Sequence, residues 1–171
     1  SENNVNTYIS LHEDYHSGDI ANPQLTVGGV PDPRVPAERN LINGANDGVT
    51  VMWSQLLYTS EASEIPMATW QEAQLIIAEA EIEAGSAAAA VAAINVMRTH
   101  YSLPLYAGGT LAEVKLQLIE ERRRQLFVQG HRLGDMIRFG LPFEQGLDPK
   151  GQPFIPGVTC IPIRPADADP T

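Results

Sequence analysis

One short motif in the sequence could do hydrolytic chemistry. His12-Glu13-Asp14-Tyr15-His16 fits the His-Glu-x-x-His pattern of zinc proteases. That chemistry needs both histidines on one helical turn, a third ligand, and Glu13 as base to a zinc-bound water. Gly18 and Pro23 would break any helix soon after the motif. A zinc metalloprotease is therefore kept as the third of three hypotheses. Its possible third ligands are His100 and His131.

A second group of charged residues, Glu120-Glu121-Arg122-Arg123-Arg124, lies inside an apolar helical pattern. A helical stripe through Ile119 and Leu126 passes through position 122 or 123. One arginine should therefore point toward the core rather than into open water. Its aliphatic stem would be buried, and its guanidinium would need a carboxylate partner.

The carboxylates available to such an arginine lie in the run itself and at Asp135. Arg132 and Arg138 flank Asp135 at three-residue spacing, as neighbours on a helix do. Two interpretations are open: a binding site for an acidic ligand, or an ion-pair network that fixes the angle between two helices. We favour the network, because structural networks perturb charges as readily as sites do. Its expected members are Glu120, Glu121, Arg123, Arg132, Asp135 and Arg138.

Aromatic side chains on loops could stack on the apolar faces of sugars. Aromatic residues make up only 6% of the chain, and core packing is the more frequent role for each. Trp70 opens an amphipathic helical pattern and is expected in the core. The weak candidates for ligand contact are Trp53, Tyr58, Tyr101 and Tyr106.

Composition excludes several classes of function. The 171 residues suit one domain, and the net charge of −10 would repel nucleic acid and anionic lipid. The one cysteine, Cys160, permits no internal disulfide. No apolar segment approaches the roughly 18 residues of a membrane span. No residue is assigned to catalysis or to a metal, and we expect no cofactor.

The elements that must position these residues differ between the two parts of the chain. Residues 1–66 are rich in Gly, Pro, Asn and Asp, which predicts loops, with 49–58 as the one compact apolar stretch, a strand or a short helix. Residues 67–171 carry helical signals. A capping box at Thr69 and Glu72 starts the first helix. Its predicted core face comprises Trp70, Ala73, Ile77, Ala80 and Ala84.

Three further helices follow by the same reasoning. Gly85 and Ser86 suit the turn into a second helix, so the two form a hairpin. A second capping box at Thr110 and Glu113 starts a long helix that extends to about Gly130. A short helix should cover 133–138. The core face of the second helix should comprise Ala90, Ile94, Met97 and Tyr101. The predicted fold class is all-α with long irregular loop-rich segments.

Two stretches resemble one protein family. The first is Ala73-Gln-Leu-Ile-Ile-Ala-Glu-Ala80 with Gly85 and Ala93-Ile-Asn-Val-Met-Arg98. The second begins with Glu120-Glu-Arg-Arg-Arg-Gln-Leu-Phe-Val-Gln-Gly-His-Arg-Leu-Gly-Asp135 and continues through Arg138 and Gly140. In content and order they are similar to the late helical hairpin and C-terminal signature of SusD/RagB proteins. Asp32-Pro-Arg34 and Ile161-Pro-Ile163 also match pieces of that family.

The resemblance implies an activity that composition does not. Members of the family are surface lipoproteins of the outer membrane with tetratricopeptide-like helical pairs. They capture glycans or peptides for a TonB-dependent, SusC-like transporter and are not enzymes. This chain is shorter than the family's usual length and has no lipidated cysteine at its start, so the anchor is expected outside it. Gln129 and Leu133 also depart from the family pattern.

Two hypotheses about function follow, together with one expectation about an exposed helix face. The first is ligand capture beside a TonB-dependent transporter. The second, of a different class, is a structural or assembly subunit that uses the helical scaffold for protein–protein contact. In either case, a solenoid-like helical pair usually needs neighbours over its faces. We therefore expect an apolar helix face that a missing N-terminal helical region or another chain covers.

Overall fold

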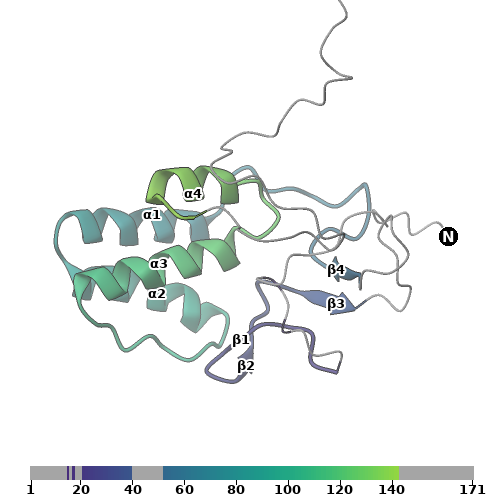
Figure 1. Ribbon diagram of the computed structural model, residues 1–171, viewed down its shortest axis with the longest axis horizontal. Helices are drawn as coiled ribbons and strands as arrows, with labels where there is room; N and C mark the ends of the chain where they lie inside the picture. Colours follow the sequence, from purple (N-terminus) through teal and green to yellow (C-terminus); the bar gives the residue numbers. More distant parts are fainter. Residues whose placement is uncertain (1–14, 16, 18–20, 40–51, 143–171) are drawn as a thin grey trace, which may run out of the picture. The chain divides into compact units, whose positions relative to one another are not determined.

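A computed structural model describes residues 15, 17, 21–39 and 52–142. The described chain is mostly helical, as predicted, and its contacts divide it into two compact units, residues 1–131 and 132–171. The first unit holds four short strands and helices α1 to α3, and the second holds helix α4 (Figure 1). None of the described helices is long and apolar enough to cross a membrane.

Helices α1 (Trp70–Glu83) and α2 (Ala87–His100) form the predicted hairpin. The Thr69 hydroxyl accepts a hydrogen bond from the Glu72 backbone N–H at 3.1 Å, which satisfies one free donor of the first turn. Between the helices, Gly85 adopts φ 81°, a left-handed conformation that suits glycine. The Thr69 cap and the Gly85 turn are thus confirmed. Ser86, which we expected to cap the second helix, precedes α2 but makes no side-chain capping hydrogen bond.

Helix α3 (Leu111–Gln125) begins at a complete capping box. Thr110 accepts from the Glu113 backbone N–H, and the Glu113 carboxylate accepts from the Thr110 backbone N–H at 2.7 Å. The prediction that this helix extends to about Gly130 was wrong, because it ends at Gln125. A turn follows, in which Leu126 and Phe127 are buried and Val128 adopts φ 56°. Burial of this apolar pair takes precedence over another helical turn.

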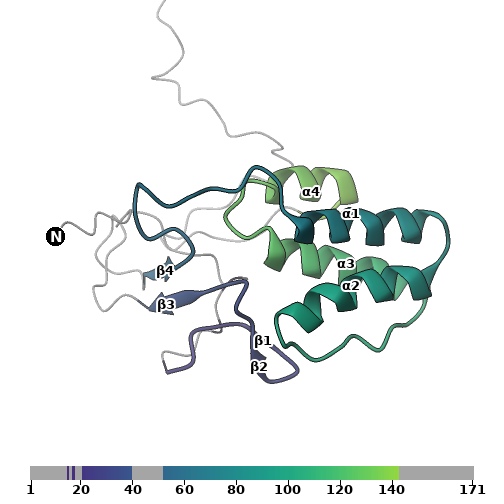
Figure 2. The same cartoon turned by 180° about the vertical axis from the view of Figure 1, so that it is seen from behind.

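The three helices of the first unit pack on one another and enclose the core. They lie side by side in both views (Figures 1 and 2), and α1 contacts both α2 and α3. Alanines on α1 and α2 leave room for the helices to approach closely. The buried core residues are Leu75, Ala78, Ile82, Ala90, Ala93, Ile94, Met97, Val114, Leu118 and Leu126.

The predicted core face of α2 is largely confirmed, whereas that of α1 was wrong. Ala90, Ile94 and Met97 are buried, and Tyr101 is half-buried at the helix end. On α1 the buried stripe is Leu75, Ala78 and Ile82. The residues predicted for the core are exposed, Trp70 by 43% and Ile77 by 46%. Both stripes have helical spacing and both are apolar, so periodicity could not tell them apart.

The loop-rich segment contains two small antiparallel ladders that the sequence did not predict. Strands β1 (Thr26–Val27) and β2 (Val30–Pro31) flank Gly28 and Gly29, both with positive φ, as a tight hairpin turn requires. Strands β3 (Ala37–Arg39) and β4 (Trp53–Gln55) pair with Glu38 opposite Ser54. The apolar stretch 49–58 therefore contains a strand, one of its two predicted forms.

The second unit contains α4 (Arg132–Phe139), which corresponds to the short helix predicted over 133–138. Its end is marked by Gly140 at φ 63°. Within it, Arg138 Nη2 donates to Asp135 Oδ1 at 2.9 Å, a pairing one helical turn apart.

Candidate functional site

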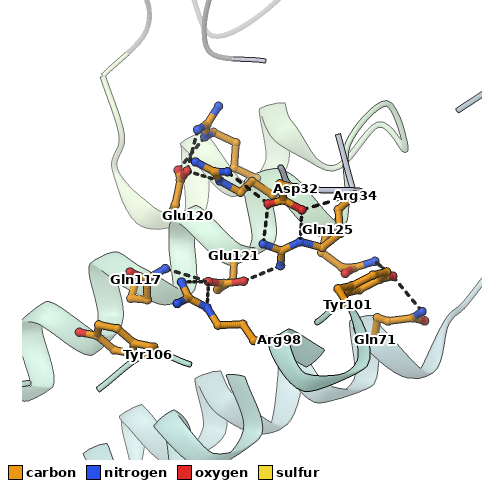
Figure 3. Close-up of polar contacts among 12 residues, drawn as sticks. Asp32, Arg34, Gln71, Arg98, Tyr101, Tyr106, Gln117, Glu120, Glu121 and Gln125 are labelled. Carbon is orange, nitrogen blue, oxygen red and sulfur yellow. Dashed lines mark hydrogen bonds and ion pairs between the residues drawn. The ribbon is translucent and has the colours of Figure 1, made fainter. Parts of the chain in front are cut away.

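The most extensive polar cluster of the first unit is centred on Glu121 of α3, whose side chain is almost completely buried (Figure 3). Its Oε1 accepts hydrogen bonds from Arg98 Nε of α2 and from Gln117 Nε2, each at 2.8 Å. Its Oε2 accepts from Arg34 Nη1, which comes from the segment between β2 and β3. A buried carboxylate is tolerable here because charged donors occupy both of its oxygens.

Arg34 is held on its other side by Asp32. Arg34 Nε donates to Asp32 Oδ1 and Arg34 Nη2 to Asp32 Oδ2, both at 2.8 Å, as a bidentate pair. Asp32 Oδ2 also accepts from Arg124 Nη1 of α3 at 3.2 Å. Arg98 Nη1 donates in addition to the Pro104 carbonyl at 3.0 Å. Three arginines, Arg34, Arg98 and Arg124, thus connect the loop segment, α2, α3 and the chain that follows α2.

The electrostatics of this cluster favour the charged forms. Burial alone would raise the pKa of Asp32, but hydrogen bonds and charge from Arg34, with a further bond from Arg124, hold that pKa below its usual 3.8. Burial lowers the pKa of Arg34, and Asp32 and Glu121 outweigh it, so the guanidinium is a still weaker acid than usual. The buried side chains of Asp32 and Arg34 are therefore an ionised pair.

A second, more exposed pairing continues along α3. Arg123 donates through Nε and Nη2 to the two Glu120 oxygens at 2.8 and 2.7 Å, and Arg124 Nε donates to Glu120 as well. These bonds outweigh burial and lower the pKa of Glu120 below its usual 4.5. The Arg123 guanidinium also lies 5.2 Å from the centre of the Tyr15 ring.

Tyr101 joins this ionic cluster to a set of amides. Its hydroxyl accepts from Gln71 Nε2 at 3.1 Å and from Gln125 Nε2 at 3.2 Å, so it lies between α1 and α3 (Figure 3). Arg34 lies 5.8 Å from the centre of its ring. The hydroxyl therefore bridges two helices.

Chemically, the cluster is suited to holding segments together. Each buried carboxylate meets guanidinium groups through both of its oxygens, and opposite charges offset one another within about 3 Å. Such an arrangement pins the Asp32–Arg34 turn to the helices. It presents neither an activated nucleophile nor a carboxylate set apart for proton transfer.

The predicted network residues make ion pairs in two separate places: around the charged run of α3, and inside α4. Glu121 pairs with Arg34 and Arg98 rather than with an arginine of its own run, and Glu120 pairs with Arg123. Arg122 is the buried arginine of the run, in line with the inward position expected at 122 or 123. Asp135 pairs with Arg138 inside α4. A link from Arg132 and Asp135 to the α3 run stays a prediction.

The residues that sequence reasoning missed are Asp32, Arg34 and Arg98 as members of one buried cluster. In the sequence, Asp32-Pro-Arg34 resembles a piece of the family pattern within a predicted loop, and nothing local assigns it to a cluster. Arg34 and Glu121 are 87 positions apart, so no local spacing joins them. The usable signal was weak: a charged turn flanked by Pro31 and Pro36.

Four aromatic residues were weak candidates for ligand contact, and they lie in unlike surroundings. Trp53 on β4 is buried, and Tyr58 and Tyr101 are half-buried. Tyr106 packs partly against the helical core, with Arg98 5.6 Å from its ring centre. Trp70, expected in the core, is instead the exposed tryptophan, with its ring edge-on to His100 at 5.0 Å. The assignment of a binding role to any of these residues stays a prediction.

The zinc-protease motif lies outside the described residues at His12, Glu13, Asp14 and His16. Among the residues that the structure does describe, no group of three or more His, Cys, Asp or Glu side chains could hold a metal ion. Cys160 and the stretch Ile161-Pro-Ile163 also lie outside the described part.

Comparison with known proteins points to one family. Residues 72–156 match the SusD family, a range that begins in the first turn of α1 and includes α2 to α4. A search of curated proteins found no match.

A solved structure supports the same fold. The chain is similar to a SusD superfamily protein from Bacteroides vulgatus ATCC 8482, with a TM-score of 0.51 and 19% sequence identity. The alignment covers 81% of this chain and 38% of that one, so the chain spans well under half the length of the protein it resembles.

Proposed function

The chain belongs to the SusD family through residues 72–156, and from this premise we propose that it is part of a nutrient-capture protein rather than an enzyme. In this role the protein binds an oligosaccharide or peptide at the surface of the outer membrane. It then presents the ligand to a SusC-like, TonB-dependent transporter. The family match is the observation that carries the proposal, with the shared fold as support.

The helical arrangement is consistent with this role. We propose that the α1–α2 hairpin, which packs on α3, serves as one of the tetratricopeptide-like pairs of the family's scaffold. The Glu121 cluster is then a structural joint that keeps the Asp32–Arg34 turn at a constant position on the helices. A rigid scaffold of this kind suits capture, because binding then spends little free energy on ordering the protein.

Binding measurements test the proposal. Isothermal titration calorimetry of the purified chain against a panel of oligosaccharides and peptides should reveal saturable binding to at least one class. Heat-unfolded chain is the control and should bind none. Co-expression with a SusC-like transporter should yield a complex. A folded chain that binds no member of the panel and does not co-purify with that transporter would contradict nutrient capture.

A structural or assembly subunit is the second candidate, and one observation favours it. The apolar stripe of α1 that faces away from the core is exposed, with Trp70 and Ile77 both more than two-fifths accessible. Contiguous apolar surface of this kind is typical of contact with another protein segment. Assembly without any small ligand would support this candidate over capture.

A further inference from the structure

The turn that follows α3, residues 126–130, holds one residue in an unusual backbone conformation. Val128 adopts φ 56°, in the left-handed region, and its side chain is 49% exposed. A β-branched residue is strained there, because its Cβ crowds the following carbonyl oxygen. Gly130 adopts φ 80° in the same turn without this strain. The strain of the turn is therefore concentrated at Val128.

An aromatic contact keeps the turn in this form. The Phe127 side chain is 3% exposed, and its ring packs against Tyr15 with the ring centres 5.0 Å apart. The Arg123 guanidinium lies 5.2 Å from the centre of the same Tyr15 ring. Tyr15 comes from the N-terminal part of the chain, so the contact joins segments that are distant in sequence. Burial of Phe127 offsets the strain at Val128.

A second arrangement of the same residues is available, in which α3 continues for one more turn. Val128 lies seven residues after the buried Glu121 and three after the buried Gln125, so a longer helix would place it on the core stripe of α3. Phe127 would leave the core. The strain would disappear, and a left-handed Gly130 would suit the end of the longer helix. The two arrangements thus exchange burial of Phe127 for burial of Val128.

The balance between the two arrangements depends on Tyr15. Phenylalanine buries more apolar surface than valine, which favours the observed turn. Relief of the left-handed strain and one more turn of helical hydrogen bonds favour the longer helix. Backbone strain at one residue and partial burial of one apolar side chain have free energies of the same order. A single ring contact can therefore decide between the two arrangements.

We propose that the turn 126–130 has two states and that Tyr15 selects between them. With Tyr15 in contact, α3 ends at Gln125; without that contact, α3 continues to Gln129 and ends at Gly130. The turn leads to α4, which begins at Arg132, so the N-terminal segment determines the form of the connection between the two units. The inference concerns conformation, and a failure of the binding titrations above would leave it intact.

Residue-resolved hydrogen exchange of the full chain tests the proposal at one amide. In the longer helix the Val128 N–H would donate to the Arg124 carbonyl, whereas in the turn the Phe127 N–H donates to that carbonyl at 3.4 Å. Tyr15→Ala should therefore raise the protection factor of the Val128 amide by about tenfold. Tyr15→Phe retains the ring contact and should leave the protection factor unchanged. Loss of an ordinary packing contact would lower it instead.

Substitutions at Val128 shift the balance without touching Tyr15. Val128→Ala favours the helix over a left-handed residue, so it should also raise the protection factor at position 128. Val128→Gly suits the turn and should abolish the effect of Tyr15→Ala when the two changes are combined. Val96→Gly, at a valine of α2 that is 48% exposed, is the matched control. It should lower the unfolding temperature, whereas Val128→Gly should maintain or raise it.

The outcomes separate a two-state turn from a fixed one. Higher protection at position 128 in Tyr15→Ala and in Val128→Ala, abolished by the glycine, would support the proposal. Unchanged or lower protection in both variants would overturn it, as would equal destabilisation by Val128→Gly and Val96→Gly. If circular dichroism shows that Tyr15→Ala unfolds the chain, the result for Val128→Ala decides by itself.

Discussion

Glu121 accepts hydrogen bonds from Arg34, Arg98 and Gln117 while its own side chain is almost completely out of water. A carboxylate in this position offsets two buried guanidinium groups at once. The carboxylate stabilises the fold less through the net strength of its ion pairs than through the penalty that its removal would cause. Two arginines would then be buried without their shared counter-charge.

Replacement of Glu121 by Gln should therefore be strongly destabilising. We expect the free energy of unfolding to fall by about 3–5 kcal/mol, the range found when one partner of a buried pair is removed. Urea unfolding followed by circular dichroism measures it. Glu83→Gln, which removes the exposed pair with Lys115 at 3.4 Å, is the matched control and should cost about 1 kcal/mol or less. Similar losses in both variants would contradict the structural role of the buried cluster.

The lowered pKa of Asp32 predicts the direction of acid sensitivity. Because the folded-state pKa lies below the usual 3.8, the stabilisation is complete above 3.8 and is lost as the pH falls through the lower folded value. The pKa of Glu120 is also lowered in the folded state, so its protonation reduces stability in the same direction as the pH falls. Unfolding free energies measured from pH 7 down to pH 2.5 should fall in this acidic range. The loss should be shallower in Asp32→Asn, and identical slopes in the two proteins would refute the assignment.

At the scale of elements, the helix boundaries follow local chemistry. The Thr110–Glu113 capping box satisfies donors at the start of α3 that no intrahelical carbonyl can reach. The end of α3 is different, because Leu126 and Phe127 turn into the core and stop the helix at Gln125. The start of a helix can therefore be read from four residues, whereas its end here depends on packing.

Loss of the α3 cap should be measurable by itself. Thr110→Ala should lower the free energy of unfolding by about 0.5–2 kcal/mol, the usual cost of losing a side-chain N-cap. Thermal unfolding of this variant is compared with Thr99→Ala, an exposed threonine inside α2 where alanine favours the helix. If Thr99→Ala were as destabilising as Thr110→Ala, the capping bonds would not explain the effect.

At the scale of the whole chain, the described loop-rich segment is joined to the helices by contacts between residues distant in sequence. Arg34 reaches Glu121, Arg124 reaches Asp32 and the Thr26 carbonyl, and Gly28 lies close to Pro104. The β1–β2 hairpin and the turn after it are therefore held at the end of α2 and along α3. The ion pairs act across the first unit rather than within one element.

Hydrogen exchange can test this connection. Arg34→Ala should speed exchange of backbone amides in 26–39 by at least about tenfold, because Asp32 and Glu121 lose their shared cation. The amides of the α1–α2 hairpin should change less. Arg39→Ala, a half-buried arginine on β3, is the control within the same segment. Uniform acceleration along the whole chain would indicate global destabilisation instead of release of this segment.

Features that depend only on neighbouring residues could be predicted from the sequence. The two threonine caps, the Gly85 turn and the short helix before Gly140 are encoded within a few positions of where they act. The α2 core face at Ala90, Ile94 and Met97 could be read from spacing as well. The run from Glu120 to Gly140 was enough to indicate the family.

Tertiary structure alone decided the features that depend on distant contacts. α1 has two apolar stripes of the same period, and only packing against α2 and α3 selected Leu75, Ala78 and Ile82 for the core. The arginine partners of Glu121 lie 23 and 87 positions away, beyond any helical spacing. The physical reason is the same in both cases. Burial and ion pairing depend on distance in space, which local periodicity does not specify.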